Sequence, residues 1–152
     1  MTPAERWYRR GAELARAECY AQALEPLEQA LACSVHQPQL SFLASLRSFY
    51  GLTVAHLRGD VLRGRRLCEE AVRVRPMDPE LYVNLARVYL RANRRDLAIE
   101  AAQTAAALNA SHPAASELLV ALGKRRPPVF AFLSRSHPIN KYAGMIRHRL
   151  AG

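Results

Sequence analysis

The side chains that could catalyse a reaction or bind a metal ion are few and scattered in this sequence. Its five histidines form neither an HExxH motif nor a pair at i, i+4 spacing, the arrangements that bring two imidazoles to one zinc ion. Asp60, Asp78 and Asp96 each fall where a helix is expected to begin, which is typical of helix caps rather than catalytic acids. No P-loop, GxGxxG or GxSxG motif occurs. We therefore predict a protein that is not an enzyme and that needs neither a cofactor nor a metal ion.

The cysteines indicate a reducing compartment rather than a disulfide framework. Cys19, Cys33 and Cys68 are odd in number and form no CxxC pair. Cys68 has arginines beside it but no histidine nearby in the sequence, which favours a buried structural thiol over a nucleophile. Residues 1–7 lack the apolar core of a secretory signal, and no apolar run approaches the roughly 18 residues that span a bilayer. The predicted location is cytoplasmic, with the inner face of a membrane as the alternative.

Arginine is the most distinctive residue type for binding chemistry, and positive charge increases toward the C-terminal end. The net charge is +9, and 20 of the 22 basic residues are arginine, whose planar donor fork suits carboxylate and phosphate groups. Residues 1–60 balance six arginines with six acids, whereas residues 113–152 hold seven Lys or Arg and one acid. A biased genome composition would also explain the preference for arginine. The pattern predicts a nearly neutral body with a basic C-terminal end.

Helices must position these residues, because helix signals are dense and strand signals are almost absent. Thr2, Pro3 and Glu5 form a capping-box pattern, and Asn93 and Gly59 stand where a left-handed residue would end a helix. Apolar residues recur at spacings of three and four. The expected helices lie near residues 3–17, 21–33, 38–58, 61–74, 79–92, 95–108, 113–122 and 138–150.

Small residues recur at fixed spacing along these helices. Three sets share a spacing of 12 and then 7 residues: Gly11, Ala23 and Ala30; Leu52, Gly64 and Ala71; and Ala86, Ala98 and Ala105. Two helices approach closely only where their side chains are small, so the spacing predicts antiparallel helical hairpins. Ala71 and Ala105 are 34 residues apart and Ala30 and Ala71 are 41 apart, which indicates an insertion around residues 34–41.

The pattern resembles the tetratricopeptide repeat family, whose 34-residue unit has an aromatic, a leucine–glycine pair, a tyrosine, two alanines and a closing proline. The matching residues are Trp7, Gly11, Tyr20, Ala23 and Ala30 in the first unit, Gly51, Gly64, Ala71 and Pro76 in the second, and Tyr82, Leu85, Ala86, Tyr89, Ala98 and Ala105 in the third. The first unit lacks the closing proline, Ser48 replaces the aromatic in the second, and Ala110 replaces the proline in the third.

The resemblance covers about residues 4–123 and implies an all-α fold. The expected architecture is a right-handed α-solenoid of about three helix-turn-helix repeats plus a C-terminal capping helix. The repeats would occupy about 4–37, 45–78 and 79–112, with an extra helix at 113–122. Together they would form a solenoid over 1–123, followed by a basic, proline-broken tail over 124–152.

In this family the first helix of each hairpin lines a concave groove. The resemblance implies these groove residues: Tyr8, Arg9, Arg16, Phe49, Tyr50, His56, Asn84, Arg87 and Arg91. Aromatic rings mixed with Arg and Asn would suit an extended or helical peptide that bears carboxylates. Alternatively, Phe49 and Tyr50 are core residues of a long helix. The lysines with which the family's chaperone-binding members hold a terminal carboxylate are missing, so we do not predict that activity.

The tail after Gly123 combines prolines, basic residues and an amphipathic pattern. Its candidate docking residues are Phe130, Phe132, Ile139, Lys141, Tyr142, Ile146 and Arg147. This segment could cap the last apolar face of the solenoid, dock on an anionic membrane or a partner, or fold back into the groove as a competing ligand.

The predicted function is a non-catalytic adaptor or assembly chaperone that binds a peptide segment of another protein in its concave groove. The alternative is a nucleic-acid-binding or membrane-surface docking module that uses the arginine-rich groove and the basic tail. Nucleic acid is the less favoured partner, because Glu69 and Glu70 partly cancel the charge of their helix. Self-association into a homo-oligomer through the stacking faces is a third possibility.

Overall fold

The computed structural model describes residues 1–35 and 42–123. Every regular element in these ranges is an α-helix, which confirms the all-α prediction for the described residues. The helices are α1 (Pro3–Arg16), α2 (Tyr20–Ser34), α3 (Leu43–Leu57), α4 (Val61–Val74), α5 (Pro79–Arg91), α6 (Arg95–Leu108) and α7 (Pro113–Ala121). They agree with the predicted ranges within a few residues. The helix expected at 138–150, the start of the one expected at 38–58, and the tail residues lie outside the described residues.

The helix starts follow the predicted capping chemistry. The Thr2 hydroxyl accepts a hydrogen bond from the Glu5 backbone N–H at 3.2 Å, and the Glu5 carboxylate accepts one from the Thr2 N–H at 2.7 Å. Asp60 and Asp78 cap α4 and α5 through their carboxylates. Asp96 differs from the prediction, because it lies inside the first turn of α6 and Arg94 occupies the cap position without a side-chain hydrogen bond.

The odd-numbered helices all end in the same way. One residue after the C-cap of α1, α3, α5 and α7, the backbone turns left-handed: Glu18 (φ 60°), Gly59 (φ 70°), Asn93 (φ 61°) and Gly123 (φ 66°). At α1 and α5 paired backbone bonds complete a Schellman motif, as in Cys19 N–H to Leu14 C=O at 2.9 Å. The same turn geometry therefore recurs at each hairpin, although its residue type changes.

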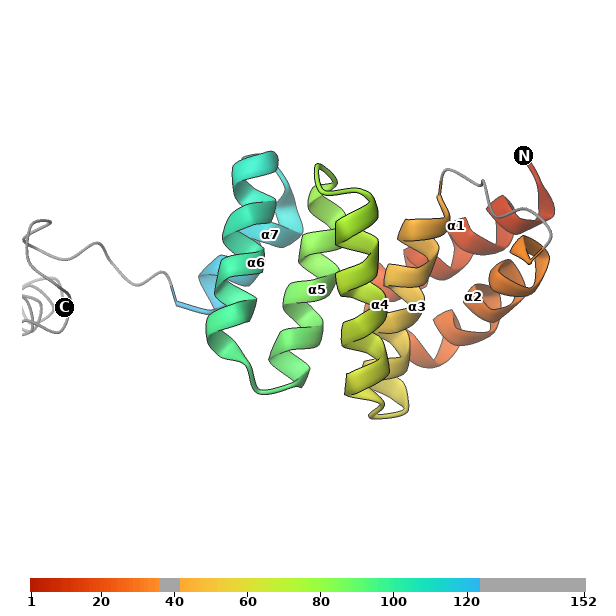
Figure 1. Cartoon of the computed structure of the whole chain (residues 1–152), viewed down its shortest axis with the longest axis horizontal. Helices are drawn as coiled ribbons and strands as arrows, with labels where there is room; N and C mark the ends of the chain where they lie inside the picture. The colour runs from red at the N-terminus through yellow and green to blue at the C-terminus, as the bar shows by residue number, and fades with distance from the viewer. Residues whose placement is uncertain (36–41, 124–152) are drawn as a thin grey trace, which may run out of the picture. The chain divides into compact units, whose positions relative to one another are not determined.

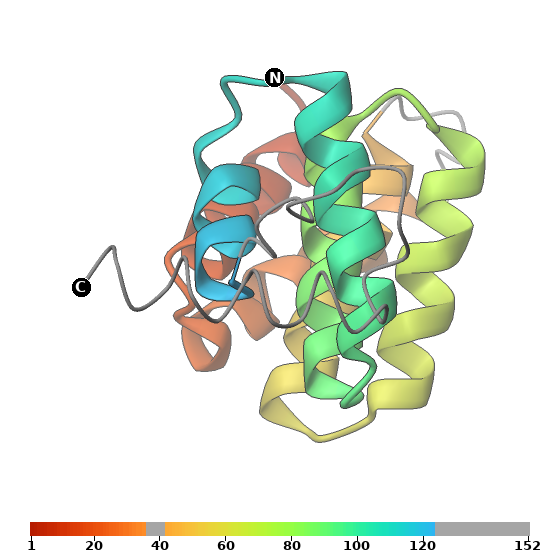
Figure 2. The same ribbon diagram turned by 90° about the vertical axis from the view of Figure 1, so that its left-hand side faces the viewer.

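The helices pack as consecutive antiparallel neighbours within one compact unit, Met1–Leu122 (Figure 1). α1 packs against α2, α3 against α4, and α5 against α6. Each odd-numbered helix also contacts the next odd-numbered helix, whereas no two even-numbered helices contact each other in the described part of the chain. Figure 2 looks along this row from the end formed by α6 and α7. The odd-numbered helices thus form one continuous layer, and the even-numbered helices lie along it.

The helix α3 is the centre of the core. It contacts α1, α2, α4 and α5, and eleven of its fifteen residues are buried. Leu46, Phe49, Leu52 and Val54 have almost no exposed surface. A helix that is apolar on all sides is expected where other helices surround it, and this enclosure decides which of the predicted groove residues remain accessible.

Glycines allow the closest approach between paired helices. A Cβ added at Gly51 would stand 2.8 Å from the Gly64 carbonyl oxygen and 2.9 Å from the Leu67 Cβ. At Gly11 an added Cβ would meet the Leu27 side chain at 2.6 Å. The 12-and-7 spacing assigned the contact with Gly64 to Leu52, which is wrong, whereas the family pattern matched Gly51, the residue that makes this contact. Leu52 instead belongs to the core cluster that includes Leu85 of α5.

Candidate partner-binding surface

Three of the nine predicted groove residues are buried in the core, so the prediction that they contact a partner is wrong. Phe49 and Asn84 are 0% exposed and Tyr50 is 7% exposed. Phe49 and Tyr50 lie on α3, which four other helices enclose, and Asn84 lies on α5, which itself contacts α3, α4, α6 and α7. Asn84 donates a hydrogen bond from Nδ2 to the Ser48 hydroxyl at 3.2 Å, within the core. The alternative prediction, that Phe49 and Tyr50 are core residues, agrees with these positions.

At the N-terminal end of the odd-numbered layer, the chain's own contacts occupy two of the three predicted residues, Tyr8 and Arg16. The Tyr8 ring stacks on Phe42 with centroids 5.0 Å apart, and burial raises the pKa of the Tyr8 phenol. The Arg16 guanidinium lies 4.9 Å from the Phe49 ring centroid and forms two-pronged hydrogen bonds with Glu80, the shortest of them 3.0 Å. Arg9 is exposed. Tyr8 and Arg16 therefore stabilise the fold here rather than presenting free groups.

The C-terminal part of the layer contains a depression, which we call the α5–α7 hollow. Its volume is about 270 Å³, and its walls come from the α1–α2 turn, the end of α3, α5 and α7. The lining residues are Glu18, Tyr20, His56, Arg87, Leu90, Ala114, Glu117, Leu118 and Ala121. His56 and Arg87 belong to the predicted groove set, so the structure brings these two together in an open depression.

Arg87 is the one arginine that lines the α5–α7 hollow, together with two acids, Glu18 and Glu117. Its guanidinium is mostly buried, with 14% of the side chain exposed, and lies 3.8 Å from a carboxylate oxygen of Glu18. Glu18 is 67% exposed, and it extends from the left-handed turn after α1. A separation near 4 Å with one exposed partner makes a weak ion pair. Arg87 is thus held in place but only loosely neutralised.

An aromatic pair forms one wall of the same hollow. The rings of Tyr20 and His56 stack with centroids 4.5 Å apart and planes 21° apart. The His56 Nε2 atom is buried without a hydrogen-bond partner. Burial, followed by the positive charge of Arg91, lowers the pKa of His56, which keeps the imidazole neutral at pH 7. Burial also raises the pKa of Tyr20. This wall is therefore uncharged and presents ring surface.

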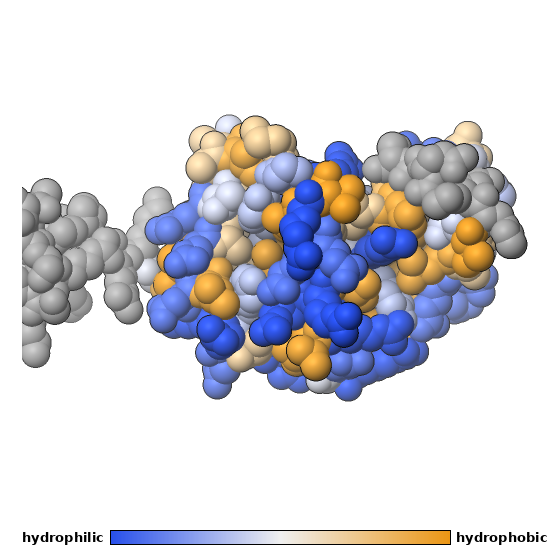
Figure 3. Space-filling view, viewed as in Figure 1, coloured by the Kyte–Doolittle hydropathy of each residue, from blue (hydrophilic) through white to orange (hydrophobic). Residues whose placement is uncertain are grey.

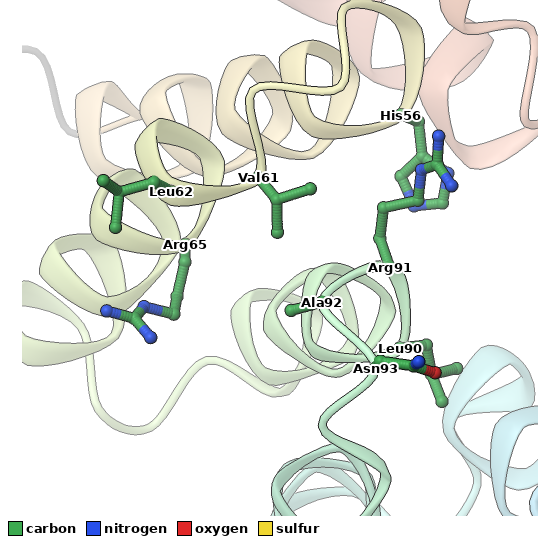
Figure 4. Close-up of a pocket in the computed structure, with 8 residues that line it drawn as sticks. All are labelled: His56, Val61, Leu62, Arg65, Leu90, Arg91, Ala92 and Asn93. Carbon is green, nitrogen blue, oxygen red and sulfur yellow. The ribbon is translucent and has the colours of Figure 1, made fainter.

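A second depression, the α4–α5 cleft, adjoins the hollow. Its volume is about 790 Å³ (Figure 4). The lining residues are His56, Val61, Leu62, Arg65, Leu90, Arg91, Ala92 and Asn93. His56 and Leu90 line both depressions, so the two are neighbours. The predicted residue Arg91 belongs to this cleft rather than to the α5–α7 hollow.

Several lining residues had no functional signal in the sequence. Tyr20 was named only as a match to the repeat pattern, and no role was predicted for Glu18, Arg65 or Leu118. These residues come together only in the folded chain, where separate helices and turns meet. No local spacing in the sequence encodes this arrangement. The predicted tail residues, from Phe130 to Arg147, lie outside the described residues.

The rest of the described surface is mixed in character. Figure 3 shows hydrophilic side chains covering most of the face that Figure 1 presents, with apolar residues in separate patches. Burial raises the pKa of the Cys68 thiol to about 12, so this cysteine is an unreactive core residue. No group of His, Cys, Asp or Glu that could hold a metal ion occurs among the described residues. No helix there is long and apolar enough to cross a membrane.

The function of this chain is inferred from its surface. No protein-family model matches the chain, and no curated protein matches it. The features that bear on function are then the two adjoining depressions, the loosely paired Arg87, and Arg91, which has no ion-pair partner in the described part of the chain.

Proposed function

We propose that this chain is a non-catalytic protein-interaction module, an adaptor or assembly chaperone, that binds a peptide segment of a partner on its odd-numbered helix layer. The observation that supports this most is the α5–α7 hollow with Arg87 on its wall. It combines a mostly buried cation with the apolar surfaces of Leu90 and Leu118. Such a mixture binds a chain that carries a carboxylate beside an apolar side chain.

The proposal includes a right-handed α-solenoid of the tetratricopeptide type as the scaffold. It is supported by the left-handed turn that recurs after α1, α3, α5 and α7. The contacts between successive odd-numbered helices, with none between even-numbered ones in the described residues, also support it. In such an arrangement the odd-numbered layer is the inner face, where a partner segment can contact several repeats together.

The partner segment would replace Glu18 as the counter-ion of Arg87. Because the 3.8 Å pair with Glu18 is weak, exchanging it for a partner carboxylate costs little. The apolar neighbour of that carboxylate would cover Leu90 and Leu118 and remove their surface from water. The wall of Tyr20 and His56 would supply ring surface without a competing charge.

The test is a charge reversal, Arg87→Glu with Arg91→Glu, in the full chain. The partner is captured from the native host by the unaltered protein and identified by mass spectrometry, and its affinity for the variants is then measured by calorimetry. We expect a loss of about tenfold or more, with helicity by circular dichroism unchanged. Arg66→Glu with Arg73→Glu changes the net charge equally at exposed positions of α4 and is the control.

Unchanged affinity of the Arg87→Glu, Arg91→Glu variant would reject the binding surface. Loss of the captured protein after nuclease treatment would favour the nucleic-acid alternative, and that binding should weaken steeply with salt.

A further inference from the structure

We propose that the partner segment extends from the α5–α7 hollow into the α4–α5 cleft, and that the cleft takes a second acidic residue of the segment together with its apolar neighbour. This inference rests on the proposed function. It goes beyond that function by assigning a second subsite, lined by the predicted residues His56 and Arg91 and by residues of α4 that were not predicted, and by defining the segment as acidic at two positions.

The first step of the argument is continuity. His56 and Leu90 line both depressions, so a chain lying in the hollow reaches the cleft by passing these two residues. The cleft is also the larger of the two, at about 790 Å³ against about 270 Å³. An extended chain advances about 3.3 Å per residue, so a segment of several residues is needed to run from one depression into the other.

The second step is the shape of the cleft. Figure 4 places Val61 and Ala92 in its middle, with Arg65 on one side and Arg91 beside His56 on the other. Leu62, which is 63% exposed, adds apolar surface at the edge. An apolar centre between two cations matches a segment that presents an apolar side chain next to a carboxylate.

The third step is charge. The lining of the cleft contains two arginines and no acid. Arg91 has no ion-pair partner among the described residues, and the Arg65 Nε atom is buried without a hydrogen bond. The nearest carboxylate to Arg65, that of Glu69, stands 3.6 Å away and already accepts a hydrogen bond from the Tyr89 hydroxyl at 3.0 Å. These incompletely satisfied donors favour an anionic occupant.

Charge also argues against the chain's own C-terminal segment as the occupant. Residues 124–152 contain seven Lys or Arg and no acid, so they carry the same sign as the cleft. Single-stranded nucleic acid fits the charge but binds through open aromatic faces. The lining of the cleft holds a single aromatic ring, His56, which stacks on Tyr20, so successive bases have no row of rings on which to stack. An acidic peptide is the occupant that satisfies both the charge and the apolar centre.

The experiment titrates the full-length, ¹⁵N-labelled protein with a synthetic octapeptide of alternating aspartate and leucine. Backbone amides of Val61, Leu62 and Asn93 report on the cleft, and those of Ala114 and Leu118 report on the hollow. We expect both groups of amides to shift with one common dissociation constant. A peptide with asparagine in place of aspartate should bind at least tenfold more weakly.

Two variants of α4 separate the cleft from general charge effects. Arg65→Glu should weaken octapeptide binding about tenfold. Arg66→Glu makes the same change in net charge at the adjacent exposed position, outside the cleft, and should alter binding less than twofold. A tetrapeptide of the same pattern should bind more weakly than the octapeptide. When it occupies only the hollow, its affinity should be the same for the unaltered protein and for Arg65→Glu.

The possible failures are distinguishable. Shifts confined to the hollow amides, or equal effects of Arg65→Glu and Arg66→Glu, would reject the cleft subsite and leave the proposed function standing. No shift in either group would reject both. Cleft shifts produced instead by raising the protein concentration, or by oligouridylate, would assign the cleft to a second copy of the chain or to nucleic acid and would overturn the inference.

Discussion

Replacing Gly64 with alanine should destabilise the fold, because α3 and α4 touch through their backbones at this point. The added Cβ would overlap the Gly51 carbonyl oxygen and would stand 2.7 Å from the Ala55 Cβ. Ordinary contacts of a Cβ begin near 3.4 Å. Neither obstacle can rotate away, since one is a backbone oxygen and the other is a Cβ of an enclosed helix. The two helices must therefore move apart.

The expected magnitude follows from two opposing effects. Overpacking a core costs about 1–3 kcal/mol, and rigid obstacles place this site near the upper end of that range. Alanine favours a helix over glycine by about 1 kcal/mol, which offsets part of the cost. The net loss in the free energy of unfolding is then about 2 kcal/mol. For a domain of this size that corresponds to a fall in Tm of roughly 8 °C.

The assay is thermal and urea unfolding of Gly64→Ala, followed by circular dichroism. Gly59→Ala is the control, because a Cβ at Gly59 meets nothing within 4 Å and the only cost is its left-handed backbone. Gly51→Ala should resemble Gly64→Ala, because it introduces the same overlap from the other helix. An unchanged or raised Tm for Gly64→Ala would refute the close approach of the paired helices.

Three further predictions follow from single residues. Glu18→Gly should raise the free energy of unfolding by about 1 kcal/mol by relieving a left-handed backbone, whereas Glu18→Gln should not, and calorimetry distinguishes them. Iodoacetamide at pH 8 should alkylate the two exposed cysteines and spare Cys68 until the protein unfolds, as mass spectrometry would show; rapid native alkylation would contradict the burial. Because the pKa of His56 is lower in the folded state, the unfolded state takes up a proton on His56 at a higher pH than the folded state does. Stability should therefore fall as pH drops below 6.5, and His56→Gln should reduce this fall in urea titrations.

Helix positions could be predicted from the sequence because their signals are local. The capping box at Thr2 and the left-handed turns at Gly59 and Asn93 depend on residues within one turn of each other. Glu18 adopts the same left-handed turn, yet glutamate gives no hint of it. Its conformation is set by the packing of α1 against α2, so the sequence could not reveal it.

Helix rotation was harder to predict than helix position. A shift of one residue turns a side chain by about 100° around the helix axis. The spacing of small residues assigned Leu52 to the contact with Gly64 of α4, whereas the structure uses Gly51 for that contact and places Leu52 in a core cluster with Cys68 of α4 and Leu85 of α5. The same uncertainty affected Phe49 and Asn84, which share a predicted groove face with accessible residues but point into the core. The family pattern matched Gly51 in the second unit but also placed Phe49 and Asn84 in the groove, so it predicted helix rotation only in part.

The candidate surface is shorter than the predicted groove because the predicted arginines differ in how far other residues of the chain already neutralise them. Arg16 is held by a two-pronged interaction with Glu80 at 3.0 Å, across 64 residues of sequence. Arg87 is held by Glu18 at 3.8 Å, and Arg91 has no such partner in the described residues. Three arginines of the same predicted role thus differ in how much of their charge remains for a partner. Since the acids that pair with them come from other parts of the fold, Glu80 from α5 and Glu18 from the turn after α1, only the fold ranks these three arginines by the positive charge that each leaves for a partner.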